Sequence, residues 1–244
     1  MKRLRADLHI HTALSPCCAD EMTPPAIVQA AVSAGLDMIA VCDHNAAGNA
    51  EATLEAAGSA LAVIAGMEIT TAEEAHVLGL FPAPSNALAA ASEVLATLPD
   101  APESLTRWGE QWLMDREGRM VGKERRLLAA ASGLDLAAAL DLIHRYSGLA
   151  VASHVDRPSF SIPSQLGLIP AEARLEALEI SAEGRRRGRD RRFGCLGLPL
   201  LCSSDSHHLE EIGGGLTFIR AEAATFEELA MALGRTGGRR VLDA

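Results

Sequence analysis

Short apolar runs alternate with helical stretches along most of this chain. The apolar runs have the length and composition of buried strands, and they occupy residues 4–8, 37–42, 62–67, 75–81, 149–153, 175–180, 198–202 and 216–219. Helix start and stop signals between them predict helices over residues 23–34, 48–57 and 225–233. This rhythm is typical of an α/β fold with a mainly parallel sheet or barrel.

The rhythm stops between residues 82 and 148. Ala-rich segments there predict no strand, but helices over residues 86–98, 102–114, 123–131 and 136–146. We therefore expect one barrel domain made of residues 1–81 and 149–244, interrupted by a helical insertion at 82–148. The insertion is expected either to shape a substrate pocket or to serve in dimerisation.

Imidazoles and carboxylates follow five of the predicted strands. They are His9 and His11, Asp43 and His44, Glu68, His154, and finally Asp205 and His207. Because the carboxyl ends of parallel strands meet at one edge of a sheet or barrel, these side chains are expected to lie together. Histidine and carboxylate are ligands of borderline and hard divalent metals. The pattern predicts a hydrolytic site with several metal ions.

Spacing within these motifs favours shared ions. One residue separates His9 from His11, and another separates Asp205 from His207, so each pair points to one side of an extended segment. Glu68 ends a strand, where its carboxylate can bridge two ions. A tight hairpin after Glu68 would bring His76, at the start of the next strand, back to the same cluster.

The ordered motifs resemble those of the PHP (polymerase and histidinol phosphatase) family. They are His9-Ile10-His11, Asp43-His44, Gly66-Met67-Glu68, His76-Val77-Leu78-Gly79, Ser153-His154 and Asp205-Ser206-His207. The resemblance implies a distorted (β/α)7 barrel that binds two or three divalent ions (zinc, manganese, iron or magnesium) and hydrolyses phosphate esters. It implies that the metal ligands are His9, His11, His44, Glu68, His76, His154, Asp205 and His207, with Glu68 as the bridging carboxylate.

The sequence departs from the family pattern at two places. Many small phosphoesterases of the family carry Ser-Asp-Gly soon after the HxH motif, with the Asp as a ligand. Asp20 is the nearest equivalent here and is expected to be a ligand, with Glu21 as the alternative. His154 is followed by Val155-Asp156-Arg157 instead of the frequent His-Pro, so Arg157 becomes a candidate phosphate clamp. Asp43 is expected to orient a ligand imidazole.

Composition limits the remaining classes of function. The net charge of −10 and the 3% aromatic content disfavour a broad nucleic-acid surface, although the arginine run at 185–192 favours one locally. No apolar run is long enough to span a membrane, and the basic start lacks the apolar core of a signal peptide, so we expect a cytoplasmic protein. Cys17 and Cys18 lie near the histidines and are interpreted as loop fillers, with metal ligation as the alternative.

The leading hypothesis is a metal-dependent phosphoesterase acting on a small phosphorylated metabolite or a nucleotide. Its catalytic residues are expected to be Glu68, Arg157 and Asp43. A nuclease that trims oligonucleotides is the first alternative, with nucleic acid a less favoured partner. A non-catalytic metal-binding accessory domain is the second, and the deamination or amide hydrolysis of other histidine–aspartate barrels is the third.

Overall fold

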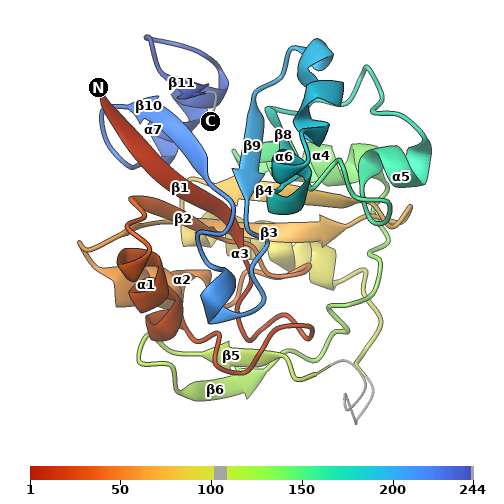
Figure 1. Cartoon of the computed structure of the whole chain (residues 1–244). Coiled ribbons are helices and arrows are strands. Elements are labelled where there is room, and N and C mark those ends of the chain that lie inside the picture. Colours follow the sequence, from red (N-terminus) through yellow and green to blue (C-terminus); the bar gives the residue numbers. More distant parts are fainter. Residues whose placement is uncertain (102–108, 243–244) are drawn as a thin grey trace.

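A nine-stranded sheet forms the centre of the computed structural model, which describes residues 1–101 and 109–242 (Figure 1). Its order is β11-β10-β1-β2-β3-β4-β7-β8-β9. The strands are β1 (Lys2–Ile10), β2 (Met38–Val41), β3 (Ala62–Thr70), β4 (His76–Phe81), β7 (Leu149–Ala152), β8 (Ala177–Ser181), β9 (Leu200–Ser203), β10 (Thr217–Ala221) and β11 (Arg240–Leu242). Neighbours are parallel from β1 to β3 and from β7 to β9, while β4 runs antiparallel between β3 and β7.

The sheet curves until β9 meets β1. Ile10 forms a parallel bridge with Ser206, and the His11 amide donates to the Ser206 carbonyl oxygen at 3.0 Å. The Thr217 hydroxyl bonds both the amide and the carbonyl oxygen of Cys202 at 2.9 Å, which joins β10 to β9. The strands from β1 to β9 therefore form a nearly closed barrel, and the predicted distorted barrel is confirmed. The distortion is the reversed direction of β4.

Helices cover the barrel on its outside (Figure 1). They are α1 (Pro24–Ser33), α2 (Ala50–Ala57), α3 (Pro84–Leu95), α4 (Leu136–Arg145), α5 (Ile162–Leu166), α6 (Ala182–Arg186) and α7 (Phe226–Leu233), with short 3₁₀ turns at Arg189–Arg192, Gly194–Leu196 and Leu209–Glu211. Small and branched apolar side chains fill the layers between helices and strands, as the low aromatic content requires. Within the described residues, no helix has the length and apolarity needed to cross a bilayer.

The region from 82 to 148 differs from its predicted all-helical character. Helices α3 and α4 lie close to the expected 86–98 and 136–146 and belong to the barrel's outer layer, where α3 packs on β3 and β4 and α4 packs on β4 and β7. Between them lies an antiparallel hairpin of β5 (Trp112–Met114) and β6 (Met120–Lys123), and 123–131 is not helical. Of the expected helix 102–114, residues 102–108 lie outside the described residues, and residues 112–114 form β5.

Two sets of hydrogen bonds from side chains to the backbone account for this difference. The Asp115 carboxylate accepts hydrogen bonds from the amides of Glu117 and Arg119, and Gly118 has a positive φ of 78°, which together form a turn. The buried Gln111 side chain bonds the backbone of Glu124, Arg126 and Leu128, and so satisfies an extended segment. These interactions outweigh the helix propensity of the alanines.

The hairpin supports the loop that follows β1. The Trp112 amide donates to the Ala13 carbonyl oxygen at 2.9 Å, and Asn49 bonds both Trp112 and Met114 through its side-chain amide. At Gly109 there is no room for a Cβ, which would overlap the Pro16 carbonyl oxygen. The hairpin segment therefore fixes residues 13–16 beside the ends of the barrel strands.

Candidate functional site

Six histidines and three carboxylates were candidate ligands for one cluster, and the barrel brings all of them except Asp20 together. The members come from strand ends far apart in sequence, and they are His9, His11, His44, Glu68, His76, His154, Asp205 and His207. His9 and Glu68 are almost fully buried, while His207 is a quarter exposed at the rim. Groups of these residues hold their ligand atoms within 4.8 Å of one another.

Glu68 lies at the centre of the cluster. Its Oε1 is 3.0 Å from His76 Nδ1, 3.2 Å from His154 Nε2 and 3.5 Å from His9 Nε2. Its Oε2 is 3.1 Å from His44 Nδ1 and 3.6 Å from His11 Nε2. The two oxygens of one carboxylate thus face two different sets of imidazoles, which is the arrangement of a group that bridges two ions.

These short contacts are not ordinary hydrogen bonds. The Glu68 Oε1, His44 Nδ1 and His76 Nδ1 atoms are buried and have no hydrogen-bond partner among the described residues. Nitrogen and oxygen atoms bound to one ion at about 2.1 Å lie roughly 3.0–3.5 Å apart, which matches the contacts around Glu68. Buried polar atoms left without partners are costly unless something else satisfies them. The donor set therefore fits divalent metal ions.

Asp205 connects this centre to Arg157. Its Oδ1 lies 3.0 Å from His11 Nε2 and 3.3 Å from His9 Nε2. Its Oδ2 accepts a hydrogen bond of 2.5 Å from Arg157 Nη1. The Arg157 side chain is 39% exposed, so it reaches solvent while holding a buried carboxylate. Besides the predicted phosphate clamp, Arg157 thus has a second role in fixing Asp205.

The structure does not bring Asp20 to the cluster. Its side chain is exposed and accepts a hydrogen bond of 3.1 Å from the Trp112 indole. A turn instead brings the exposed Cys17 against the rim of the cluster, because the Cys18 amide bonds the Ser15 carbonyl and the Ala19 amide bonds the His207 carbonyl. The expected ligand role of Asp20 is not supported by this placement, and the thiol of Cys17 lies 3.1 Å from His207 Nε2.

Asp43 acts through a serine and not on the adjacent His44. Its carboxylate is fully buried and accepts bonds from the Thr12 amide, the Thr12 hydroxyl and the Ser15 hydroxyl at 2.7–2.8 Å. The Ser15 oxygen lies 3.0 Å from His11 Nδ1 and accepts from the His44 amide at 3.1 Å. Asp43 therefore acts on the cluster through the Ser15 hydroxyl, which contacts the imidazole of His11.

Two supporting carboxylates were missed by the sequence reasoning. Glu179 on β8 is 1% exposed, contacts His9 Nδ1 with both oxygens at 3.1–3.2 Å, and accepts from the His154 amide at 3.0 Å. Asp7 is fully buried and accepts from the amides of Ser204 and Gly213, which holds the loop that carries Asp205. Their signal was a single acidic residue inside an otherwise apolar strand.

Two of the seven non-glycine residues with positive φ in the described part of the chain are candidate metal ligands. His154 has a φ of 27° and Asp205 a φ of 54°, in the region that L-residues rarely adopt. Such conformations persist where the surrounding structure imposes them, and they gather at functional sites. Here they turn the side chains of two strand-end residues toward Glu68 and His11.

The charges of the cluster are strongly coupled. Burial alone lowers the pKa of His9, but Glu179, Asp205 and Glu68 raise it well above its usual value. Burial likewise opposes the rise at His44, whose pKa is raised to about 10 by contacts with Cys17 and Glu68. Burial and the neighbouring imidazoles of His44 and His207 instead hold the pKa of His11 well below its usual value. Although burial raises the pKa of the Cys17 thiol, contacts with His207 and His44 lower it to about 6.

The cluster opens into a pocket of about 210 Å³. Arg157, Ser159 and Phe160 line it together with the exposed sides of His76 and His207. The Phe160 ring stacks on His76 with centroids 5.0 Å apart, and it is 45% exposed. The lining of the pocket thus includes both an aromatic ring and a guanidinium, which suits an anionic group attached to an apolar one.

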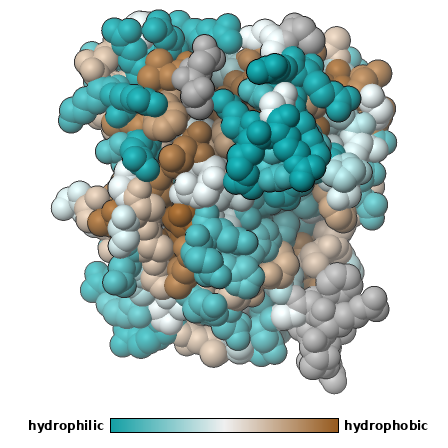
Figure 2. Space-filling model, viewed as in Figure 1, coloured by the Kyte–Doolittle hydropathy of each residue, from teal (hydrophilic) through white to brown (hydrophobic). Residues whose placement is uncertain are grey.

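The arginine run is largely paired. Arg186 and Arg187 contact Glu183, Arg185 lies 3.9 Å from Asp190, and Arg189 lies 3.5 Å from Asp156. Hydrophilic side chains gather over this part of the surface in Figure 2, where Figure 1 places α6. The pairing favours the interpretation of most of the run as a solvated face.

Comparison with known proteins identifies the family. The profile of the PHP domain matches residues 7–180, and that of a PHP-associated domain matches residues 194–236. Because the first match covers more than half of the chain, the protein belongs to the PHP family. Comparison with curated proteins gives no match.

Solved structures share the fold at low sequence identity. The lesion-specific Endonuclease Q from Pyrococcus furiosus has a TM-score of 0.73 and 19% identity over 98% of this chain. This chain spans 58% of that protein, which is also known in complex with a 27-mer duplex carrying an abasic lesion. A protein from Bifidobacterium adolescentis described as a metal-dependent phosphoesterase has a TM-score of 0.61 and 18% identity, covering 94% of this chain and 96% of its own. An amidohydrolase from Chromobacterium violaceum with bound sulfate has a TM-score of 0.60 and 17% identity, covering 93% and 96%.

Replacing Glu179 by Gln tests the support of His9. We expect the Glu179→Gln protein to fold but to bind divalent metal about 10–100-fold more weakly, because the amide orients and polarises the imidazole less well. Competition with a coloured chelator measures the affinity. Glu176→Gln is the matched control, since Glu176 contacts His144 outside the cluster. Equal affinities in the two variants would contradict the role of Glu179.

Metal binding is expected to release protons near neutral pH. In the metal-free protein, raised pKa values keep His9 and His44 protonated there, and a protonated imidazole cannot bind an ion. Affinity should therefore increase with pH until the pKa of His44, about 10, is passed. Titration of zinc in weakly buffered solution with a pH indicator measures the release. An affinity that stays constant from mildly acidic to alkaline pH would contradict this prediction.

Proposed function

We propose that this protein is a metal-dependent phosphoesterase that acts on a phosphorylated metabolite or a nucleotide. The observation that carries the proposal is the position of Glu68, whose two buried carboxylate oxygens face separate sets of imidazoles. A carboxylate in this position could hold two ions, one through each oxygen. Membership of the PHP family and the folds of the similar structures are consistent with a hydrolase of this kind.

The residues divide into those that hold ions and those that hold substrate. An ion on one side of Glu68 would be held by His9, His76 and His154. An ion on the other side would be held by His11, His44 and His207. Asp205 contacts both His9 and His11. When bound, such ions neutralise a phosphate ester and activate water as a nucleophile. Water adds to phosphorus, the bond to the leaving oxygen breaks, and the phosphate product and an alcohol are released.

Arg157 has the geometry to orient the phosphate. One of its terminal nitrogens bonds Asp205, and the guanidinium keeps further N–H donors for a second anion at the mouth of the pocket. Phe160 covers His76 and restricts the access of water on that side. Manganese and zinc are the ions we expect first, because the ligands are imidazole and carboxylate.

Glu68→Gln tests this proposal. The neutral amide cannot hold two ions, so turnover of p-nitrophenyl phosphate should fall at least about 100-fold while thermal stability changes little. Elemental analysis of the same samples should find two or three divalent ions per chain in the wild type and fewer in the variant. Wild-type turnover by Glu68→Gln, or a folded wild type that binds less than one ion, would contradict the proposal.

A second candidate, a phosphodiesterase or nuclease, is favoured by the space beside the active pocket. A groove of about 810 Å³ adjoins it and shares Arg157 with it. The groove also has the cationic Arg189, and the apolar side chains of Phe193 and the largely exposed Leu168. Such a groove suits the leaving group of a diester, which needs room on the far side of the scissile phosphate. Endonuclease Q, which has a similar fold, acts on duplex DNA.

The two candidates are separated by Arg189→Ala. If the groove binds the leaving group, KM for short oligonucleotides or bis(p-nitrophenyl) phosphate should rise about tenfold, the loss of one charged hydrogen bond. Turnover of p-nitrophenyl phosphate should stay within about twofold. Arg186→Ala is the control, because Arg186 belongs to the same run but pairs with Glu183 away from the groove. Equal effects on mono- and diesters would leave the phosphomonoesterase as the better candidate.

A further inference from the structure

The thiol of Cys17 lies against one face of the histidine cluster. Its Sγ is 3.1 Å from His207 Nε2, and it also contacts His44. Sulfur and nitrogen atoms bound to one zinc ion at about 2.3 and 2.0–2.1 Å lie roughly 3.1–3.6 Å apart, so the observed contact has the distance of two ligands on a common ion.

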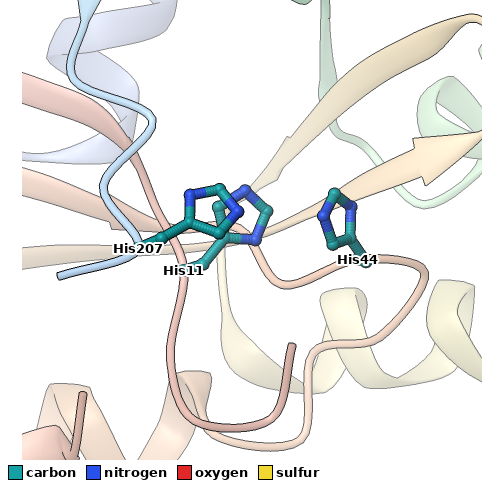
Figure 3. A group of neighbouring side chains, drawn as sticks. All are labelled: His11, His44 and His207. Atoms are coloured by element: carbon teal, nitrogen blue, oxygen red, sulfur yellow. The ribbon is translucent and has the colours of Figure 1, made fainter. Parts of the chain in front are cut away.

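Three imidazoles converge on the same side. His11, His44 and His207 hold ligand nitrogens within 4.8 Å of one another, and their rings face a common space in Figure 3. The ring centroid of His11 is 4.5 Å from those of both His44 and His207. His44 Nδ1 faces Glu68 Oε2 and is buried without a hydrogen-bond partner among the described residues, so this group has a polar atom that a bound ion would satisfy.

The position of the thiol is fixed by the fold. The turn at 15–18 is closed by the bond from the Cys18 amide to the Ser15 carbonyl, and the following Ala19 amide bonds His207 itself. Pro16 is held from the other side by the close approach of Gly109. The same turn directs Asp20 to the surface, where it bonds Trp112. The sulfur of Cys17 therefore lies where a carboxylate was expected.

We propose that Cys17 is a thiolate ligand of the ion held by His11, His44 and His207. This proposal rests on the proposed metal centre and specifies which metal binds at that position. Three imidazoles, a thiolate and the shared Glu68 carboxylate make a softer set than one in which a second carboxylate replaces the thiolate. The thiolate therefore favours zinc or cobalt over manganese and magnesium at this position. The centre then holds one zinc-selective position beside positions that accept harder ions.

Cobalt substitution tests the assignment without relying on activity. The protein loaded with Co²⁺ should have a thiolate-to-cobalt charge-transfer band in the near ultraviolet, in addition to the visible bands of cobalt bound to histidine and carboxylate. Cys17→Ser should abolish the charge-transfer band and lower the zinc affinity of one position at least about tenfold. Loss of a residue that only hydrogen-bonds to a metal ligand already costs about tenfold or more in affinity, and loss of a direct ligand should cost no less. Cys17→Asp should restore the number of ions but shift the preference of that position toward manganese.

Cys18→Ser is the matched control. Cys18 is the adjacent residue, but its side chain packs with the apolar cluster under α1. The band should persist in this variant. Wild-type protein that binds two or more cobalt ions without a charge-transfer band would overturn the role of Cys17 and leave the metal centre intact. Loss of the band in Cys18→Ser but not in Cys17→Ser would also overturn it, whereas failure to bind cobalt at all would refute the proposed function itself.

Discussion

Burial of negative charge at one edge of the barrel is the constraint on which the site depends. Asp7, Asp43, Glu68 and Glu179 are at most 1% exposed, and the Asp205 side chain is 7% exposed. Charges removed from water need close partners of opposite sign. The guanidinium of Arg157, which is 39% exposed, is such a partner for Asp205. Protonated histidines compensate part of this charge in the metal-free protein. Divalent ions would compensate it better, and would replace those protons.

The barrel supplies the geometry through two closures. The reversed strand β4 pairs His76 with Thr70, so that the side chain of a residue at the start of a strand comes within 3.0 Å of the Glu68 carboxylate. The contact of Ile10 with Ser206 brings the end of the last barrel strand to the end of the first, and thereby brings Asp205 to His11. Each closure joins segments that are separate in the chain, and each delivers at least one candidate ligand.

The segment after β7 links chemistry to substrate selection. His154 points to Glu68, Arg157 holds Asp205, and Phe160 stacks on His76, all within a few residues. Helix α5 then begins at a capping box formed by Ser161 and Ser164, which fixes the far end of the segment. Because Arg157 borders both the small pocket and the larger groove, any substrate that extends from one into the other passes this residue.

The sequence by itself determined the positions of most candidate ligands. Histidines and carboxylates at the ends of apolar runs, with the spacing of two in His9-Ile10-His11, indicated both the barrel and the common edge where these side chains meet. Asp43 was also predicted to orient an imidazole, although the choice of His11 through Ser15 required the folded loop. These features depend on local periodicity, which a single sequence carries.

The tertiary structure alone decided which groups support the candidate ligands. It also decided whether Cys17 or Asp20 lies beside His207. An acidic residue in an apolar strand, such as Glu179, looks the same in sequence whether it points to solvent or to His9. The choice between Cys17 and Asp20 depends on a turn held by a hydrogen bond to His207, almost two hundred residues away in the chain. The hairpin at 112–123 likewise depends on Gln111 and Asn49, whose side chains bond backbone brought to them by folding. Such interactions arise when distant segments pack together, and local sequence patterns do not encode them.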